Sequence, residues 1–238
     1  MKSGKIITIL FLFLLISFNA SASKLKIIIV TGGHDFDRES FFQMFDSFNN
    51  MSYIELIQPE AREQLGTIDI DSFDAVVFYD MPKTITEKEK DAYYRLLMAG
   101  KGLLFLHHSI CAYQDWPEFE SIVGGKYYEN KKDNKFGASS YQHDVDFYVQ
   151  MVHTSHPVIK GMKEFVLHDE VYGNLEVLPE IYPLLSTDHP KSNMLIGWTL
   201  TNENSKIVFI QPGHDKNSFG NPNYRRLIKQ AISYITSE

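Results

Sequence analysis

Leu103 to Leu106 form an uninterrupted apolar run that leads directly into His107, His108 and Ser109. Such a run is typical of a strand that helices cover on both faces of a parallel sheet. In open sheets of this kind, ligands bind at the carboxyl ends of the strands. The two histidines therefore fall where an α/β protein carries its chemistry.

Further apolar runs predict the other strands of such a sheet. They lie at residues 25–31, 53–57, 75–79, 194–199 and 207–210. Residues 126–165 are instead polar and aromatic with a weak alternation, which indicates an excursion of antiparallel strands and loops.

Helical patterns separate these runs. One helix is expected from about Asp37, and another ends near Gly100 after a capping-box pattern of Thr86 and Glu89. An amphipathic helix over residues 224–235 closes the chain. Strands that alternate with helices predict βαβ units and a mainly parallel sheet.

The first 22 residues have the pattern of a secretory signal peptide. Lys2 and Lys5 precede an apolar run over residues 6–16, and Ala20-Ser21-Ala22 offers the small residues that a signal peptidase reads. The run is shorter than the ~20 residues that a membrane span needs. We therefore expect cleavage before Ser23 and a secreted or periplasmic protein without a stable membrane anchor.

Residues 23–238 contain no Pro/Ser/Gly-rich linker and no internal repeat, so we expect a single domain. Loss of Lys2 and Lys5 leaves 21 of the 23 basic residues against 30 acidic ones, a formal charge of −9. This acidic balance argues against a nucleic-acid partner. Cys111 is the single cysteine, so no intrachain disulfide is possible. The sequence leaves homo-oligomerisation open.

Several short motifs follow one another along the chain. They are Gly32-Gly33, Gly100 to His107, Trp116 to Gly125, His156-Pro157-Val158 with Gly161, Asp169-Glu170 with Tyr172, and Pro212-Gly213-His214. In this order they resemble the ThuA-like (trehalose utilisation) family, and the resemblance spans nearly the whole mature chain. It implies an α/β fold of the class I glutamine amidotransferase-like type, with a flavodoxin-like, doubly wound, mainly parallel sheet.

The resemblance also permits a comparison with glutamine amidotransferases, in which a strand ends in an elbow cysteine that a later His-x-Glu activates. His107 stands at the elbow position here, and the late motif reads His214-Asp215-Lys216. A thiolate needs a base within hydrogen-bond reach and a third group that orients the base. Cys111, four residues past the elbow, is interpreted as a small buried hydrophobe. We therefore expect no glutamine hydrolysis.

Histidines follow three of the predicted strands, at His34, at His107 with His108, and at His214. Because the carboxyl ends of parallel strands meet at one edge of a sheet, we expect them to share a cleft. Two interpretations stay open. His34, His107 and His214 ligate zinc or another divalent metal, or a histidine and a carboxylate act as general base and acid without a metal.

Asp169 or Glu170 is expected to complete either arrangement, so the candidate catalytic residues are His107, His214, Glu170 and Asp169. Neighbouring residues of an extended strand point to opposite sides. Asp169 and Glu170 are therefore not predicted to form the carboxylate pair of a glycosidase.

Seven aromatic residues suggest an amphipathic wall for a sugar ring, and two or three of them are expected to line a pocket. They are Tyr113, Trp116, Tyr127, Tyr128, Tyr141, Tyr172 and Trp198. The predicted substrate-binding set is Gly33, His34, His108, Tyr113, Trp116 and Tyr172. For Gly32-Gly33, an oxyanion-type role and a simple tight turn both stay open.

Together with the resemblance, the sequence predicts an exported protein that acts on a carbohydrate or keto-sugar derivative in sugar catabolism, as a hydrolase or lyase. Two alternatives stay open. One is a non-catalytic sugar-binding or accessory protein, and the other is a hydrolase that depends on Cys111.

Overall fold

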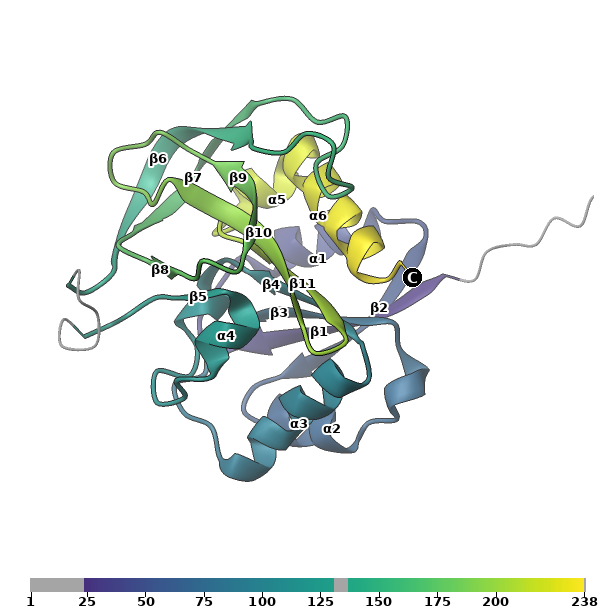
Figure 1. Cartoon of the computed structure of the whole chain (residues 1–238). Helices are drawn as coiled ribbons and strands as arrows, with labels where there is room; N and C mark the ends of the chain where they lie inside the picture. The colour runs from purple at the N-terminus through teal and green to yellow at the C-terminus, as the bar shows by residue number, and fades with distance from the viewer. Residues whose placement is uncertain (1–23, 131–136, 238) are drawn as a thin grey trace, which may run out of the picture.

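The computed structural model describes residues 24–130 and 137–237, and the predicted signal peptide over residues 1–22 lies outside them. Within the described residues, nine strands form one sheet in the order β2-β1-β3-β4-β11-β10-β9-β6-β7 (Figure 1). No helix in this part of the chain has the length and apolar character needed to cross a bilayer.

One part of the sheet, called the parallel half below, consists of strands that pair in parallel. Its strands are β1 (Leu25–Gly32), β2 (Met51–Ile57), β3 (Ala75–Asp80), β4 (Gly102–Leu106) and β11 (Ser205–Ile210). Every residue of β3 and β4 is buried, as their apolar sequence predicts. The strands expected at these positions are all confirmed.

The sheet continues beyond β11 through strands that pair antiparallel, called the antiparallel half below. Its strands are β10 (Leu195–Asn202), β9 (Tyr182–Ser186), β6 (Ser140–Met151) and β7 (Phe165–Gly173). A separate two-stranded ladder joins β5 (Gly125–Lys126) to β8 (Glu176–Val177). The predicted antiparallel excursion is thus present, and it extends the main sheet.

Helices cover both faces of the parallel half (Figure 1). On one face lie α1 (Arg38–Asp46), α5 (Lys216–Gly220) and α6 (Pro222–Ile235), and on the other lie α2 (Ala61–Thr67), α3 (Glu87–Met98) and α4 (Phe119–Val123). Two short 3₁₀ helices are η1 (Ile70–Ser72) and η2 (His107–Cys111).

The side chains of β1 divide between two apolar cores, because successive residues of a strand face opposite sides. Ile27 and Ile29 pack in the core with α1 and α6, whereas Ile28 and Val30 pack in the core with α2 and α3. The doubly covered sheet that the sequence predicts is therefore the observed one.

Helices α1 and α3 begin after the capping residues that the sequence predicts. Asp37 caps α1 through its side chain, and Thr86 with Glu89 forms a complete capping box at the start of α3. Helix α2 and strand β9 were not expected, since both are short and their sequences carry no strong periodicity.

The turn after β1 requires a glycine. Gly33 has φ +80°, and a Cβ added there would lie 2.6 Å from the backbone carbon of Met81, in the loop after β3. The tight-turn interpretation of Gly33 therefore accounts for the residue by itself. The turn carries His34 toward the edge where β4 and β11 end.

Candidate active site

The chain turns sharply at His107, where β4 ends. His107 has φ +50°, in the left-handed region that residues other than glycine rarely adopt, and it is fully buried. Its Nδ1 lies 2.8 Å from the carbonyl oxygen of Gln211. Because a carbonyl only accepts hydrogen bonds, Nδ1 carries a proton and donates it. Nε2 is thereby directed away from Gln211, toward the carboxyl edge of the sheet.

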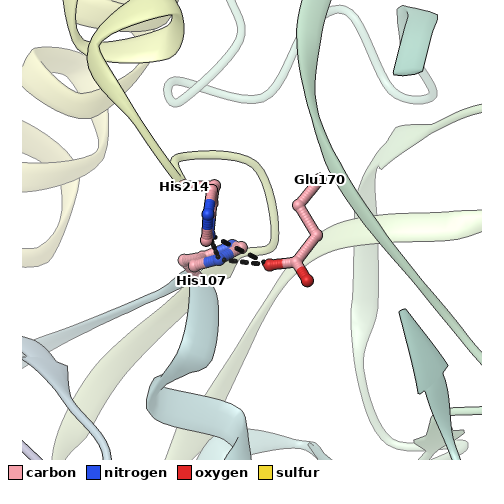
Figure 2. Close-up of side chains that lie close together, drawn as sticks. All are labelled: His107, Glu170 and His214. Carbon is pink, nitrogen blue, oxygen red and sulfur yellow. Dashed lines mark hydrogen bonds and ion pairs between the residues drawn. The ribbon is translucent and has the colours of Figure 1, made fainter. Parts of the chain in front are cut away.

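Nε2 of His107 meets two further side chains from distant parts of the sequence (Figure 2). It lies 3.0 Å from Nδ1 of His214 and 3.0 Å from Oε2 of Glu170, and His214 Nδ1 is 3.1 Å from the same carboxylate oxygen. We call His107, Glu170 and His214 the imidazole–carboxylate cluster. The expected convergence of His107 and His214 is thus present, with Glu170 between them.

Asp169 holds the loop that carries His214. Its carboxylate accepts hydrogen bonds from the backbone N–H groups of Gly213 at 2.6 Å and His214 at 3.0 Å, and from Oγ of Ser218 at 2.5 Å. Tyr79 adds a hydrogen bond from its hydroxyl to the carbonyl of Gly213 at 2.8 Å. The structure therefore places Asp169 as a positioning residue behind the cluster.

Opposite charges favour each other within the cluster. Burial alone raises the pKa of Glu170, but hydrogen bonds and charges from His107 and His214 together hold this pKa well below its ordinary value. The hydrogen bond with Glu170 in turn raises the pKa of His214 above its ordinary value, against the effect of burial. The cluster thus pairs a carboxylate with a site that favours positive charge.

A cavity of about 240 Å³ begins at Glu170. The described residues that line it are His34, Met81, His108, Cys111, Tyr127, Glu129, Tyr141, His143, Glu170 and Tyr172. Three of the seven aromatic residues singled out from the sequence are among them. Pockets for drug-sized ligands measure ~300–1,000 Å³, so this cavity suits one sugar ring.

Two predicted histidines form one wall of this cavity. The rings of His34 and His108 stack with their centroids 4.7 Å apart. Burial lowers the pKa of His34 and lowers that of His108 still further. Both imidazoles are therefore neutral near pH 7, and His34 is exposed, so a ligand can reach it.

Tyr113 and Trp116, predicted as substrate-binding residues, lie in the apolar core and not in the cavity wall. Both are fully buried, and they pack with Tyr93 and Phe119 of α3 and α4. The Tyr113 hydroxyl is 2.8 Å from that of Tyr93. Proximity to the histidines in sequence could not separate a packing aromatic from a cavity-lining one.

His143, an exposed residue of β6, also belongs to the site, although its place in the sequence does not single it out. Its Nδ1 lies 3.5 Å from Oε1 of Glu170, and its ring centroid is 4.7 Å from that of His214. The pairing of β6 with β7 shifts register between Gln142 and Val145, and Asp144 has φ +55°. This irregularity breaks the two-residue alternation, so the sequence pattern could not place His143.

Cys111 lines the cavity but is only 5% exposed. Burial raises the pKa of its thiol far above the ordinary value. A thiolate at this position is therefore strongly disfavoured, in keeping with the interpretation of Cys111 as a small buried hydrophobe.

The atoms of the cluster are of the types that bind transition metals. In the described part of the chain, His107, Glu170 and His214 are the group of such residues whose ligand atoms converge. His34 lies further out, with its ring centroid 6.2 Å from that of His214. Glu170 thus occupies the place in the candidate ligand set for which the sequence pattern favours His34.

The fold is that of the class I glutamine amidotransferase-like proteins. A ThuA-like protein from Parabacteroides merdae ATCC 43184 superposes with a TM-score of 0.77 at 17% identity, covering 90% of this chain and 91% of the other. One from Bacteroides uniformis ATCC 8492 gives 0.67 at 16% identity, with coverages of 91% and 93%. A protein of Thermoplasma acidophilum described as a GMP synthase subunit gives 0.56 at 12% identity, with coverages of 88% and 93%.

At the level of sequence, the profile of the ThuA family, described as Trehalose utilisation, matches residues 26–235. The chain therefore belongs to the ThuA family. No curated protein matches the sequence significantly.

Proposed function

We propose that this protein is an enzyme of carbohydrate catabolism, a lyase or hydrolase that acts on a sugar or keto-sugar derivative. The observation that carries the proposal is the imidazole–carboxylate cluster, whose Glu170 lines a cavity with room for one sugar ring. The membership of a family implicated in trehalose utilisation supports a carbohydrate substrate.

The residues around the cavity have different roles in the proposed reaction. Tyr127 and Tyr141 provide aromatic faces for the apolar side of a sugar ring. The imidazole of His214, which contacts Glu170 at 3.1 Å, donates a hydrogen bond to a substrate oxygen on which negative charge develops. Polar groups arranged before the reaction stabilise such charge without further reorganisation.

His34 moves the proton. Its neutral imidazole faces the cavity from the loop after β1 and is able to accept a proton from carbon or from water. For a keto-sugar, the proton on the carbon beside the carbonyl passes to His34. The electron pair of that C–H bond moves to the carbonyl oxygen. In the following step it returns to form a carbon–carbon double bond, the bond from the next carbon to the glycosidic oxygen breaks, and His34 gives its proton to the leaving oxygen.

Glutamine hydrolysis is not part of this proposal. His107 stands where an amidotransferase carries its nucleophile, and the thiol of Cys111 is buried with a raised pKa. A hydrolase that depends on Cys111 has the same difficulty. The proposal also places the mature protein outside the cytoplasm, on the basis of the signal-peptide pattern in residues 1–22.

The test is a screen of disaccharides, monosaccharides and their keto derivatives, with products followed by NMR. We expect turnover of at least one compound and a loss of about 10²–10⁴-fold in His34→Ala. Cys111→Ser should retain activity. Binding of a sugar without turnover, unaffected by His34→Ala, would support the non-catalytic accessory protein instead.

A further inference from the structure

Three atoms crowd around a single nitrogen of the cluster. Nε2 of His107 lies 3.0 Å from the Tyr172 hydroxyl, 3.0 Å from Nδ1 of His214 and 3.0 Å from Oε2 of Glu170. The other ring nitrogen of His107 already donates to the carbonyl of Gln211. Nε2 therefore has either one lone pair or one proton for three neighbours.

Hydrogen bonding cannot satisfy this arrangement. When His107 is neutral, its Nε2 lone pair can accept from Tyr172, but it then faces the lone pairs of the Glu170 carboxylate. When His107 is doubly protonated, Nε2–H can donate to Glu170, and the contact with His214 has no proton of its own. In either state at least one contact of 3.0 Å joins two atoms that no proton connects.

A cation between the three donor atoms removes this conflict, because it accepts every lone pair at once. The atoms His107 Nε2, His214 Nδ1 and Glu170 Oε2 form a nearly equilateral triangle with sides of 3.0, 3.0 and 3.1 Å. At metal–ligand distances of about 2.1 Å, atoms this far apart subtend roughly 90° at the ion. Two imidazoles and a carboxylate on one face of an octahedron leave the remaining positions open.

The surroundings of the triangle are those of a metal site. The hydrogen bond from His107 Nδ1 to Gln211 fixes the ring and its tautomer, as outer contacts of metal-bound histidines do. Asp169 fixes the backbone of His214 in the same way. Of the described residues that line the adjoining cavity, none is a lysine or arginine that would repel a cation.

We propose that His107 Nε2, His214 Nδ1 and Glu170 Oε2 bind one divalent transition metal ion, of the class that prefers imidazole and carboxylate ligands. The open positions of the ion face the cavity and take two neighbouring oxygens of the substrate, a hydroxyl beside a carbonyl or a second hydroxyl. This second part rests on the proposed function. The hydroxyl of Tyr172, 3.0 Å from Nε2 of His107, then lies beside the ion, where it can donate a hydrogen bond to a substrate oxygen.

The experiment strips the purified protein with a chelator and titrates it with Zn²⁺, Co²⁺ and Mn²⁺ by calorimetry, with the visible spectrum of Co²⁺ as a second readout. We expect one ion per chain for at least one metal. Glu170→Gln and His214→Ala should each weaken that affinity at least 100-fold, since outer contacts alone are worth 10–100-fold. His107 is not replaced, because it is fully buried and its loss would disturb the fold. Circular dichroism checks the fold of the two variants.

His168→Ala is the matched control, because His168 also stands on β7 beside carboxylates but is exposed. It should bind the ion as the unaltered chain does. The metal site is overturned if none of the three ions binds stoichiometrically, or if the Glu170 and His214 variants bind the ion as tightly as the unaltered chain does. Turnover of a sugar by the chelated protein would then leave the proposed function standing. Binding of one ion without any sugar binding or turnover would instead support the metal site and contradict the proposed carbohydrate substrate.

Discussion

The parallel and antiparallel halves of the sheet contribute different chemistry to the same site. The parallel half supplies imidazoles on the loops after β1, β4 and β11, which carry His34, His107 and His214. The antiparallel half supplies the carboxylate of Glu170 and the hydroxyl of Tyr172 from β7. Positions of the first kind follow from where strands end, whereas positions of the second kind depend on strand register.

The largest effect is expected from removing the contribution of the antiparallel half. Glu170→Gln should lower kcat/KM on the sugar found by the screen about 10³-fold, because the cluster loses its charge. His214→Ala should cost a similar factor, and the double variant little more, since residues that act as a unit are not additive. Glu164→Gln, at an exposed position just before β7, is the control. Full turnover by Glu170→Gln would mean that this half only covers the site.

The second largest effect is expected from removing the hydrogen bonds that connect the two halves. Asp169 of β7 accepts three hydrogen bonds from the segment after β11, all of them buried or nearly so. Asp169→Ala leaves their donors unsatisfied and should lower the free energy of unfolding by about 3 kcal/mol, or ~6–12 °C in Tm. Asp146→Ala, at an exposed position on β6, should change it by less than about 0.5 kcal/mol. Urea unfolding measures both, and equal stability of the two variants would contradict this role.

In the parallel half, the buried Asp80 has an environment that favours its protonated form. Burial raises the pKa of Asp80 to about 7, although Gln58 donates a hydrogen bond to it at 2.7 Å. The unfolded chain releases this proton near pH 4, so the folded state binds the extra proton between about pH 4 and pH 7. Stability should therefore fall as the pH rises through this window, by about 2–3 kcal/mol between pH 5 and pH 8.

Asp80→Asn cannot titrate and should remove this part of the pH dependence. The difference in unfolding free energy between the variant and the unaltered chain, measured by urea at several pH values, isolates Asp80 from other titrating groups. A difference that stays constant from pH 5 to pH 8 would show that Asp80 titrates normally.

The smallest effect separates packing aromatics from cavity aromatics. Trp116→Phe, in the core of the parallel half, should lower stability by about 1 kcal/mol and leave sugar affinity unchanged. Tyr141→Ala, on β6 at the cavity, should do the reverse, with sugar affinity reduced by about 1 kcal/mol and stability nearly unchanged, since Tyr141 is 61% exposed. Loss of sugar affinity in Trp116→Phe would instead support the prediction from the sequence that Trp116 binds the substrate.

These differences explain how much the sequence could predict. Unbroken apolar runs and capping residues identified β1, β3, β4 and β11, and the meeting of parallel strand ends then placed His107 beside His214. The same argument gives a neighbourhood and not the atoms in contact. It therefore included His34 in the ligand set, where the structure has Glu170 in contact with both other histidines.

Apart from β10, which the apolar run over residues 194–199 predicts, the antiparallel half was predicted only as antiparallel strands and loops without positions. Its strands alternate weakly, and the register shift between Gln142 and Val145 turns His143 toward Glu170 in a way that a two-residue period does not reveal. Tyr113 and Trp116 show the converse problem, because a large aromatic residue near a site fits a core as well as a wall.

The left-handed backbone at His107 has an evolutionary consequence. A residue other than glycine in this region costs about 1–3 kcal/mol, and this cost arises from the Cβ atom, which histidine and cysteine both have. The buried strand β4 and the helices that cover it maintain the bend. The side chain at the end of β4 can therefore change between such residues while the scaffold that presents it stays the same.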